Sequence, residues 1–220
     1  MADTLGQVSY ASTRNPFNYD KFEQIARDTT TAWLTTTEMD NQLNLFGDTS
    51  QNTYLAGLEV AVRMVIEDYL GMSIFAQSYR VYYATDSLYS TPVCLDLPEV
   101  SQGSTLTNGV TISSVKYYDG NSPSVLQTLA NTEYYYDVTG NKVILPNGTP
   151  SNISQNRTSP IIVEYALAAN ALASYPVIKQ AGLLMLTHLY NNRSETVSGG
   201  LQRIPYGVDA LLRPYKPLVM

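Results

Sequence analysis

The segment from Pro176 to Arg193 is the strongest helix signal in the chain, and its middle turns are apolar nearly all round. Pro176 suits the first position of a helix, and strong helix formers follow it. At about 100° per residue, one stripe of this helix carries Ile178, Gly182, Met185 and Leu189. We expect that stripe to face the core of the chain's own domain.

Four apolar residues of the same helix lie off that stripe, namely Leu183, Leu184, Leu186 and Tyr190. Exposing the leucines would forgo roughly 1.5–3 kcal/mol apiece and create a patch typical of an interaction surface. The apolar run 181–186 is far shorter than the ~20 residues that a membrane span requires. We therefore expect one side of the helix to pack on its own domain and the other side on a partner. The open alternative is a central helix that its own chain covers completely.

Length and charge limit what the chain can do. With 220 residues, 44% of them hydrophobic, it is long enough for one sizeable core or two small ones, and global disorder is excluded. The formal net charge of −6 makes the surface on average repulsive to phosphate, which argues against a sequence-reading nucleic-acid binder. The same charge suits a wall past which DNA slides.

The single cysteine and the N-terminus indicate the compartment. Cys94 cannot form an intrachain disulfide, and its neighbours predict a buried strand residue rather than a reactive thiol. The first residues show neither the basic nor the apolar region of a signal peptide. We therefore expect folding in a reducing cytoplasm.

The first half of the chain carries the other helix signals. Residues 1–19 are polar and are predicted to form an arm, which together with the following segment extends to residue 32. Phe22, Ile25 and Ala26 show helical spacing. The segment Thr37–Asp40 resembles a capping box and predicts a short helix that carries Leu43 and Phe46. From Thr53 to Leu70, the apolar spacing predicts an amphipathic helix with Gly71 as its C-terminal cap. Its expected buried stripe is Leu55, Leu58, Val62, Val65 and Tyr69.

The periodicity changes from helical to alternating after Gly71. One side of the next strand carries Phe75, Gln77, Tyr79, Val81 and Tyr83. Further strands are predicted at 93–97, 111–118, 124–129, 133–138, 142–145 and 160–166, with short Gly/Asn turns between them. Short strands with short turns indicate an antiparallel meander, and the whole order predicts an α+β fold. Half of the 18 tyrosines fall in these strands, as half-buried sheet residues or as part of a protein interface.

The sequence offers little for catalysis. His188 is the only histidine, and on its apolar helix it is expected to be structural rather than a catalyst or ligand. One histidine, one cysteine and no dense acidic run exclude the usual zinc spacings. The pairs Glu67/Asp68 and Glu133/Asp137 are interpreted as solvated surface. No phosphate-binding glycine loop is present. We therefore expect no enzyme, no cofactor and no metal.

The C-terminal third resembles the adaptor (head-to-tail connector) proteins of tailed bacteriophages. In that family a proline opens the last helix, a basic residue and an aliphatic block follow, and a Pro-x-Gly-Val-x-x-Leu-Leu-x-Pro-Tyr tail comes after a linker. The matching helix residues are Pro176, Lys179, Ala181, Leu183, Leu184, Leu186, His188, Tyr190, Asn192, Arg193 and Glu195. The matching tail residues are Pro205, Gly207, Val208, Leu211, Leu212, Pro214 and Tyr215.

The resemblance covers roughly residues 33–216 and departs from the family in the N-terminal arm, in Ser194 and in Lys216. It implies an adaptor core at 33–197 and a structural, non-enzymatic role at the head–tail interface, in the neck of the virion. It also implies a ring of about twelve copies. The implied neighbours are the portal protein and tail, nozzle or terminator proteins, with double-stranded DNA passing through the lumen without sequence readout and no membrane. A neighbouring copy would then cover Leu183, Leu184, Leu186 and Tyr190. The alternative function is another tail-completion or terminator-like ring protein of the neck.

The segment 198–220 is predicted to be an extended docking tail with a Gly-rich hinge. Its prolines at 205, 214 and 217 exclude one continuous helix, yet it is too apolar for a free disordered end. By resemblance, the groove that holds it belongs to the portal or to the next adaptor, while a tail folded back on its own subunit is the alternative. The expected docking residues are Arg203, Ile204, Tyr206, Val208, Leu211, Leu212, Arg213, Tyr215 and Lys216.

Overall fold

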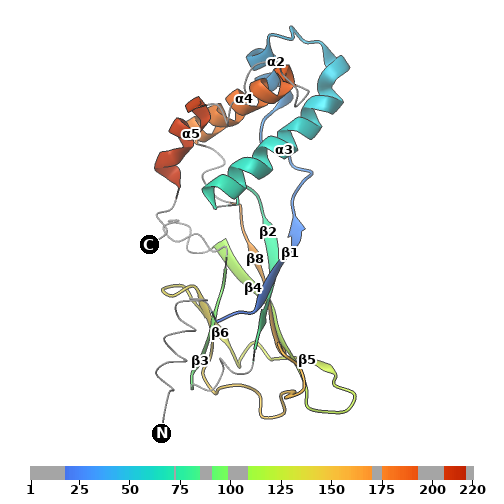
Figure 1. The fold of residues 1–220 in the computed structure, drawn as a ribbon, viewed down its shortest axis with the longest axis vertical. Helices are drawn as coiled ribbons and strands as arrows, with labels where there is room; N and C mark the ends of the chain where they lie inside the picture. Colours follow the sequence, from blue (N-terminus) through green and yellow to red (C-terminus); the bar gives the residue numbers. More distant parts are fainter. Residues whose placement is uncertain are drawn as a thin grey trace. The chain divides into compact units, whose positions relative to one another are not determined.

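The computed structural model describes residues 18–71, 73–84, 91–98, 109–169, 175–192 and 206–216. The chain divides into a β unit (residues 1–26, 77–100 and 110–167) and a helical unit (residues 27–76, 101–109 and 168–220). Figure 1 shows the strands gathered in the first unit and the helices in the second. The predicted α+β class with antiparallel strands is confirmed. The predicted meander was wrong, because β8 lies between β2 and β4 in the larger sheet and β7 lies between β3 and β6 in the smaller one.

The β unit contains two antiparallel sheets. The larger has the order β1-β2-β8-β4-β5 and the smaller the order β3-β7-β6. The strands are β1 (Lys21–Arg27), β2 (Gln77–Tyr83), β3 (Val93–Asp96), β4 (Val110–Tyr118), β5 (Leu126–Thr128), β6 (Tyr135–Asp137), β7 (Lys142–Leu145) and β8 (Ile161–Leu167). Within β2, alternate residues from Gln77 to Tyr83 are buried, as the alternation predicted. The core of the unit is partly aromatic, since the rings of Tyr79 and Tyr165 stack at 5.7 Å between centroids.

The segment around Phe22 is a strand and not a helix, so that expectation was wrong. β1 lies at the edge of the five-stranded sheet beside β2. Gln24 donates to Gln77 Oε1 at 2.9 Å, and Glu23 accepts from the Tyr82 hydroxyl at 2.7 Å on the neighbouring strand. Residues 21–27, which the prediction assigned to the arm, are therefore part of the sheet. The reason lies in the tertiary structure. Pairing with the open edge of the sheet stabilises this segment more than a helix supported by only three regularly spaced apolar residues.

The helical unit contains α2 (Thr36–Leu43), the 3-10 turn η1 (Thr49–Gln51), α3 (Asn52–Leu70), α4 (Pro176–Asn191), α5 (Tyr206–Leu212) and the 3-10 turn η5 (Arg213–Tyr215). Gly71 caps α3 with a φ of 62°, as expected. The capping box of α2 lies two residues earlier than predicted: Thr35 accepts from the Glu38 N–H, and Glu38 accepts from the Thr35 N–H at 2.8 Å. Within the described residues, no helix combines the length and apolar character needed to cross a membrane.

The core of the helical unit forms around α4. Ile178, Gly182 and Met185 are buried, and Leu189 is half-buried, in agreement with the predicted stripe. Gly182 has no room for a side chain, because an added Cβ would lie 2.6 Å from Cζ3 of Trp33. A glycine is therefore required where the indole packs against the α4 backbone.

Candidate interaction surfaces

α3 buries three of its four charged residues. The side chains of Glu59, Arg63 and Glu67 lie inside, together with Leu55 and other aliphatic residues of the helix. The expected stripe was wrong in part, since Val65 is 39% exposed whereas Leu55 and Val62 are fully buried. Compared with the predicted stripe, the buried face is therefore shifted around the helix axis toward Glu59, Arg63 and Glu67.

Two of these charges serve the backbone of the segment before α2. The Glu59 carboxylate accepts the Trp33 N–H at 3.0 Å, and Arg63 donates to the Thr31 carbonyl at 2.8 Å. Burial raises the pKa of Glu59, against the backbone hydrogen bonds and the nearby Arg63 that lower it. The Arg63 guanidinium also lies 4.6 Å from the centre of the Phe75 ring. In this way, Glu59 and Arg63 supply hydrogen-bond partners to the backbone of this loop.

Glu67 is also buried, which corrects its interpretation as solvated surface. It accepts the Ile74 N–H at 2.7 Å and the Phe75 N–H at 3.2 Å, and Arg27 Nε donates to it at 2.9 Å. Its neighbour Asp68 has a side chain that is 75% exposed. Glu67 therefore anchors the chain where it leaves α3, while Asp68 faces solvent.

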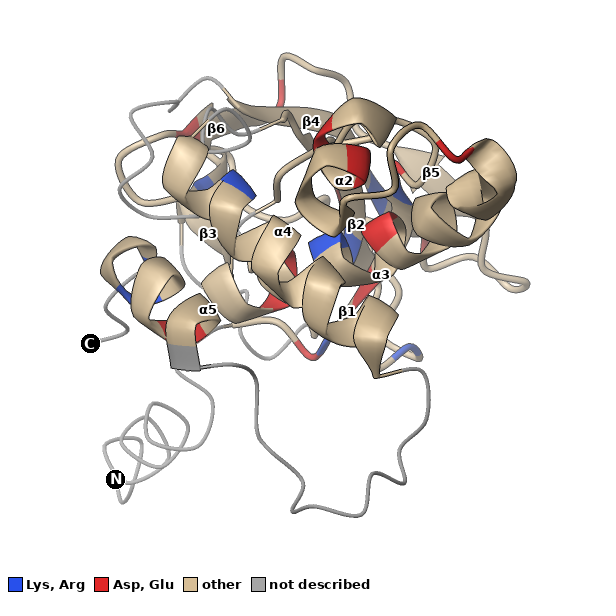
Figure 2. Cartoon of the chain, turned by 90° about the horizontal axis from the view of Figure 1, so that it is seen from above, with Lys and Arg blue, Asp and Glu red and all other residues tan. Residues whose placement is uncertain are grey.

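The opposite side of α3 is apolar and uncovered by the described residues. We call Gly57, Val60, Ala61, Met64 and Val65 the α3 outward face; at 100° per residue they share one side of the helix. Gly57, Ala61 and Val65 are exposed, and Val60 and Met64 are half-buried. The helix itself adds no charged side chain to this face before Asp68 near its C-terminal end. Seen from above, most of α3 is free of charge colouring (Figure 2).

The residues expected to form a subunit interface on α4 are largely covered by the chain itself. Leu186 is fully buried, which corrects its placement on an exposed face. Leu183, Leu184 and Tyr190 are half-buried and pack against the same helical core. The reason is that α2, α3 and α5 all pack around α4. The uncovered apolar helix surface therefore belongs to α3.

The C-terminal segment is helical over 206–215, so the prediction of an extended tail was wrong for this part. Val208 and Leu212 are buried in the helical core, and Leu211 and Tyr215 pack on it half-buried. The Tyr69 hydroxyl donates to Asp209 across the same contact. These apolar residues therefore pack against their own subunit. This arrangement matches the alternative prediction, a tail folded back on its own subunit.

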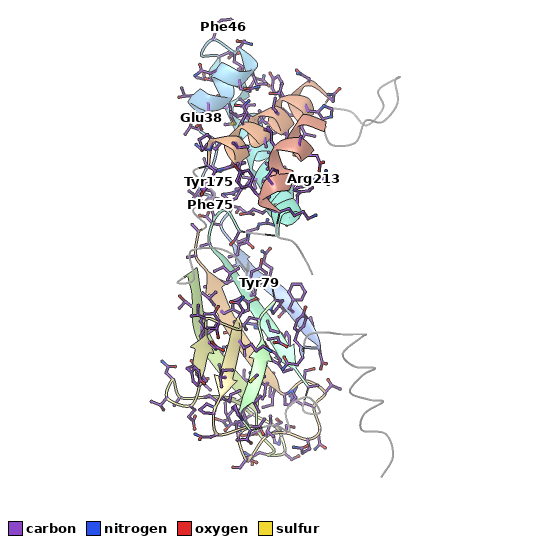
Figure 3. All side chains as sticks on the ribbon, turned by 90° about the vertical axis from the view of Figure 1, so that its left-hand side faces the viewer. Glu38, Phe46, Phe75, Tyr79, Tyr175 and Arg213 are labelled. Atoms are coloured by element: carbon purple, nitrogen blue, oxygen red, sulfur yellow. The ribbon has the colours of Figure 1, made fainter. Side chains whose placement is uncertain are left out.

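Two cations of the segment stay on the surface. Arg213 and Lys216 are exposed, and the Lys216 ammonium lies 4.7 Å from the centre of the Tyr69 ring. Figure 3 shows Arg213 on the helical unit and Phe46 at its tip. Phe46 is 96% exposed and has a φ of 54°. Arg203 and Ile204, also expected to dock, lie outside the described residues.

The other candidates for chemistry remain apart. His188 is half-buried near the end of α4, with Nδ1 3.4 Å from the Asn192 side chain. Cys94 lies in β3, as predicted, and is half-buried. Asp137 accepts from the Thr139 N–H at 2.9 Å and so caps its own turn. Among the described residues, no group of three metal-binding side chains occurs.

One ionic cluster in the β unit joins three strands. Arg80 Nε on β2 and Lys116 Nζ on β4 each donate to Glu164 on β8 at 2.8 Å. Burial alone would raise the pKa of Glu164, but hydrogen bonds from Lys116, Arg80 and Ser114 outweigh it and lower the pKa to about 2. Each charged member of this cluster is paired with another, so the cluster links three strands of the sheet.

No protein-family model matches the chain, and no curated protein matches it significantly in sequence. Its fold, in contrast, is similar to that of chains in gene transfer agent particles. A chain in the neck of an empty gene transfer agent (GTA) particle, determined with C6 symmetry, is 17% identical with a TM-score of 0.61. A chain in the virion of a native GTA particle is 15% identical with a TM-score of 0.61, and one in the native neck with C12 symmetry is 16% identical with 0.58. Each likeness covers 91% of this chain and 97% of the other.

Proposed function

We propose that the chain is the adaptor of a tailed phage or phage-like particle, a structural protein without enzymatic activity that joins the portal to the tail. The observation that carries this proposal is the fold likeness, because it spans both units and nearly the whole of a chain found in a particle neck. The resemblance of the C-terminal helix and tail to phage adaptors supports the same role independently.

In this role, twelve copies of the chain form a ring in the virion neck, around the channel through which the genome leaves. The C12 and C6 symmetries of the similar neck structures support a ring of copies. The acidic net charge of −6 supports a wall that DNA passes without being bound tightly. Contact with DNA is then weak, independent of sequence and strongly dependent on salt.

The exposed cations of the C-terminal segment fit a docking role toward an acidic neighbour, the portal. Because Val208 and Leu212 are used inside the subunit, docking relies on Arg213 and Lys216 rather than on those two apolar anchors. Rim charges of this kind govern the association rate and the salt dependence more than the affinity.

The test is reconstitution with the portal protein of the same particle. The full chain is mixed with the purified portal ring, and the complex is analysed by size-exclusion chromatography, native mass spectrometry and electron microscopy. The adaptor role predicts a ring of this chain seated on the portal. A chain that ignores the portal but joins purified tails would instead be a tail-completion or terminator-like protein, and binding to neither would refute both roles.

A further inference from the structure

The five-stranded sheet of the β unit is open at both edges within the described residues. β1 forms one edge and β5 forms the other, and there each of them is hydrogen-bonded to a single neighbouring strand. The outer side of an edge strand presents backbone N–H and C=O groups that have no ladder partner, and such a row pairs readily with a further strand. Each edge is therefore a site where another strand can add to the sheet.

Both edges combine exposed apolar side chains with little unbalanced charge. Phe22 on β1 is 40% exposed and Leu126 on β5 is 41% exposed. The segment 120–132 around β5 contains no charged residue. On β1, the Lys21 ammonium lies 3.1 Å from the Glu23 carboxylate, so the charges of this edge largely balance each other. Two copies with a net charge of −6 each can therefore approach along these edges without strong repulsion.

The two edge strands run in the same direction, because four antiparallel pairings separate them. β2 with β8, β8 with β4 and β4 with β5 are each antiparallel. The Asp20 N–H bonds to the Tyr82 carbonyl, and Asp28, later in the chain, bonds to the earlier residue Ala76. β1 is therefore antiparallel to β2 as well. A rotation about a ring axis preserves strand direction along that axis, so it brings β5 of one copy beside β1 of the next as a parallel pair.

The sheet also places the two edges at adjoining levels along the strands. The Lys21 ammonium lies 5.2 Å from the centre of the Tyr82 ring, so these two residues share one face and one level of the sheet. The strand registers continue this level from Tyr82 to Ile162, Lys116 and Thr128. The last residue of β5 is thus level with the first residue of β1. In a closed sheet the strands tilt against the axis, and the tilt slides neighbouring edges past each other by a few residues.

We infer that β1 of one copy pairs with β5 of the next and so continues the five-stranded sheet around the ring, an inference that rests on the proposed adaptor function. Opposite edges of one sheet meet, so the contact is heterologous and its repetition closes a ring. A two-fold contact would instead pair β1 with β1, and a strand of an unrelated protein would cover one edge only. A second copy of the chain is the occupant that covers both edges. Strand pairing forms one part of the contact, because a standard interface buries about 800 Å² on each partner.

The experiment is disulfide crosslinking of assembled rings, alone and on the portal ring. Adjacent strands lie about 4.8 Å apart, a separation of Cα atoms that a disulfide can span. Lys21→Cys is combined with Leu126→Cys or with Thr128→Cys, because these exposed side chains lie on one face of the sheet. The matched control combines Lys21→Cys with Tyr135→Cys, at an exposed position of β6 on the edge of the smaller sheet. The single variants control for the native Cys94 and for contacts between like edges.

We expect at least one of the two β1–β5 double variants to give a ladder of covalent oligomers on a non-reducing gel. The ladder should be at least about tenfold stronger than that of the control pair, because cysteines farther apart cannot be bridged. A mixture of Lys21→Cys with the matching single variant of β5 should give dimers only, since each copy then carries one engineered cysteine. Hydrogen exchange of the parent gives a second measurement: the amides of β1 and β5 should exchange more slowly in the ring than in the free chain.

The inference is overturned, and the adaptor function stands, if the parent forms rings in which the exchange of β1 and β5 is unchanged. Crosslinking of Lys21→Cys to itself in those rings, or the absence of a ladder from both β1–β5 double variants although they assemble, would overturn it equally. If the parent forms no oligomer alone or on the portal, the proposed function fails and the inference with it.

Discussion

Leu212→Ala is the sharpest test of how the C-terminal segment is used. Leu212 is 2% exposed and packs into the core that surrounds α4. Truncation of a buried leucine to alanine typically costs about 2–5 kcal/mol, because apolar contact is lost and a cavity remains. A leucine waiting for a portal groove would instead be exposed in the free protein, and its truncation would change the stability by less than about 0.5 kcal/mol.

The assay is urea unfolding of the free protein, followed by tryptophan fluorescence. Trp33 is the only tryptophan and lies in the same core, so its emission reports the helical unit. Leu212→Ala should lower the unfolding midpoint without changing the denaturant dependence. Arg213→Ala, one residue further and exposed, is the matched control and should leave the midpoint unchanged. Equal midpoints for parent and Leu212→Ala would refute the packing argument and restore the model of a free docking tail.

Three further predictions test the packing and the ion pairs. Gly182→Ala should destabilise the helical unit by about 1–3 kcal/mol through overpacking. Gly57→Ala, with open space around it, should stabilise the unit by about 0.5–1 kcal/mol. Urea unfolding that gives stability changes of the same sign for both variants would contradict this. Glu67→Gln should cost about 1–3 kcal/mol, because the Ile74 and Phe75 N–H groups and Arg27 lose a charged acceptor, while Asp68→Asn, which removes only an exposed partner of Arg27, should have a much smaller effect in the same assay. The pKa of Glu164 is lowered from 4.5 to about 2 on folding, so its stabilisation is present above pH 4.5 and lost as the pH falls toward 2. The stability difference between parent and Glu164→Gln, measured by urea unfolding at several pH values, should therefore shrink over that window, and a constant difference would exclude the ion pairs as its source.

Local chemistry was enough to predict much of the chain. The alternation in β2, the cap at Gly71 and the start of α4 at Pro176 depend on residues close in sequence, and their physical causes act over one or two turns. The α+β class follows from the same signals. The relation to neck proteins rested on the helix and tail motif, and the fold likeness now supports it across both units.

Tertiary structure decided which way each apolar surface faces. Only the folded chain shows that Glu59 and Glu67 accept the backbone N–H groups of Trp33 and Ile74, which places these carboxylates on the inner side of α3 and its aliphatic side outward. Only the packing of α5 on α4 shows that Leu212 is covered by its own subunit. A sequence pattern gives the period of a helix or strand, but the partner that covers each face comes from segments far away along the chain, and their position is fixed by packing.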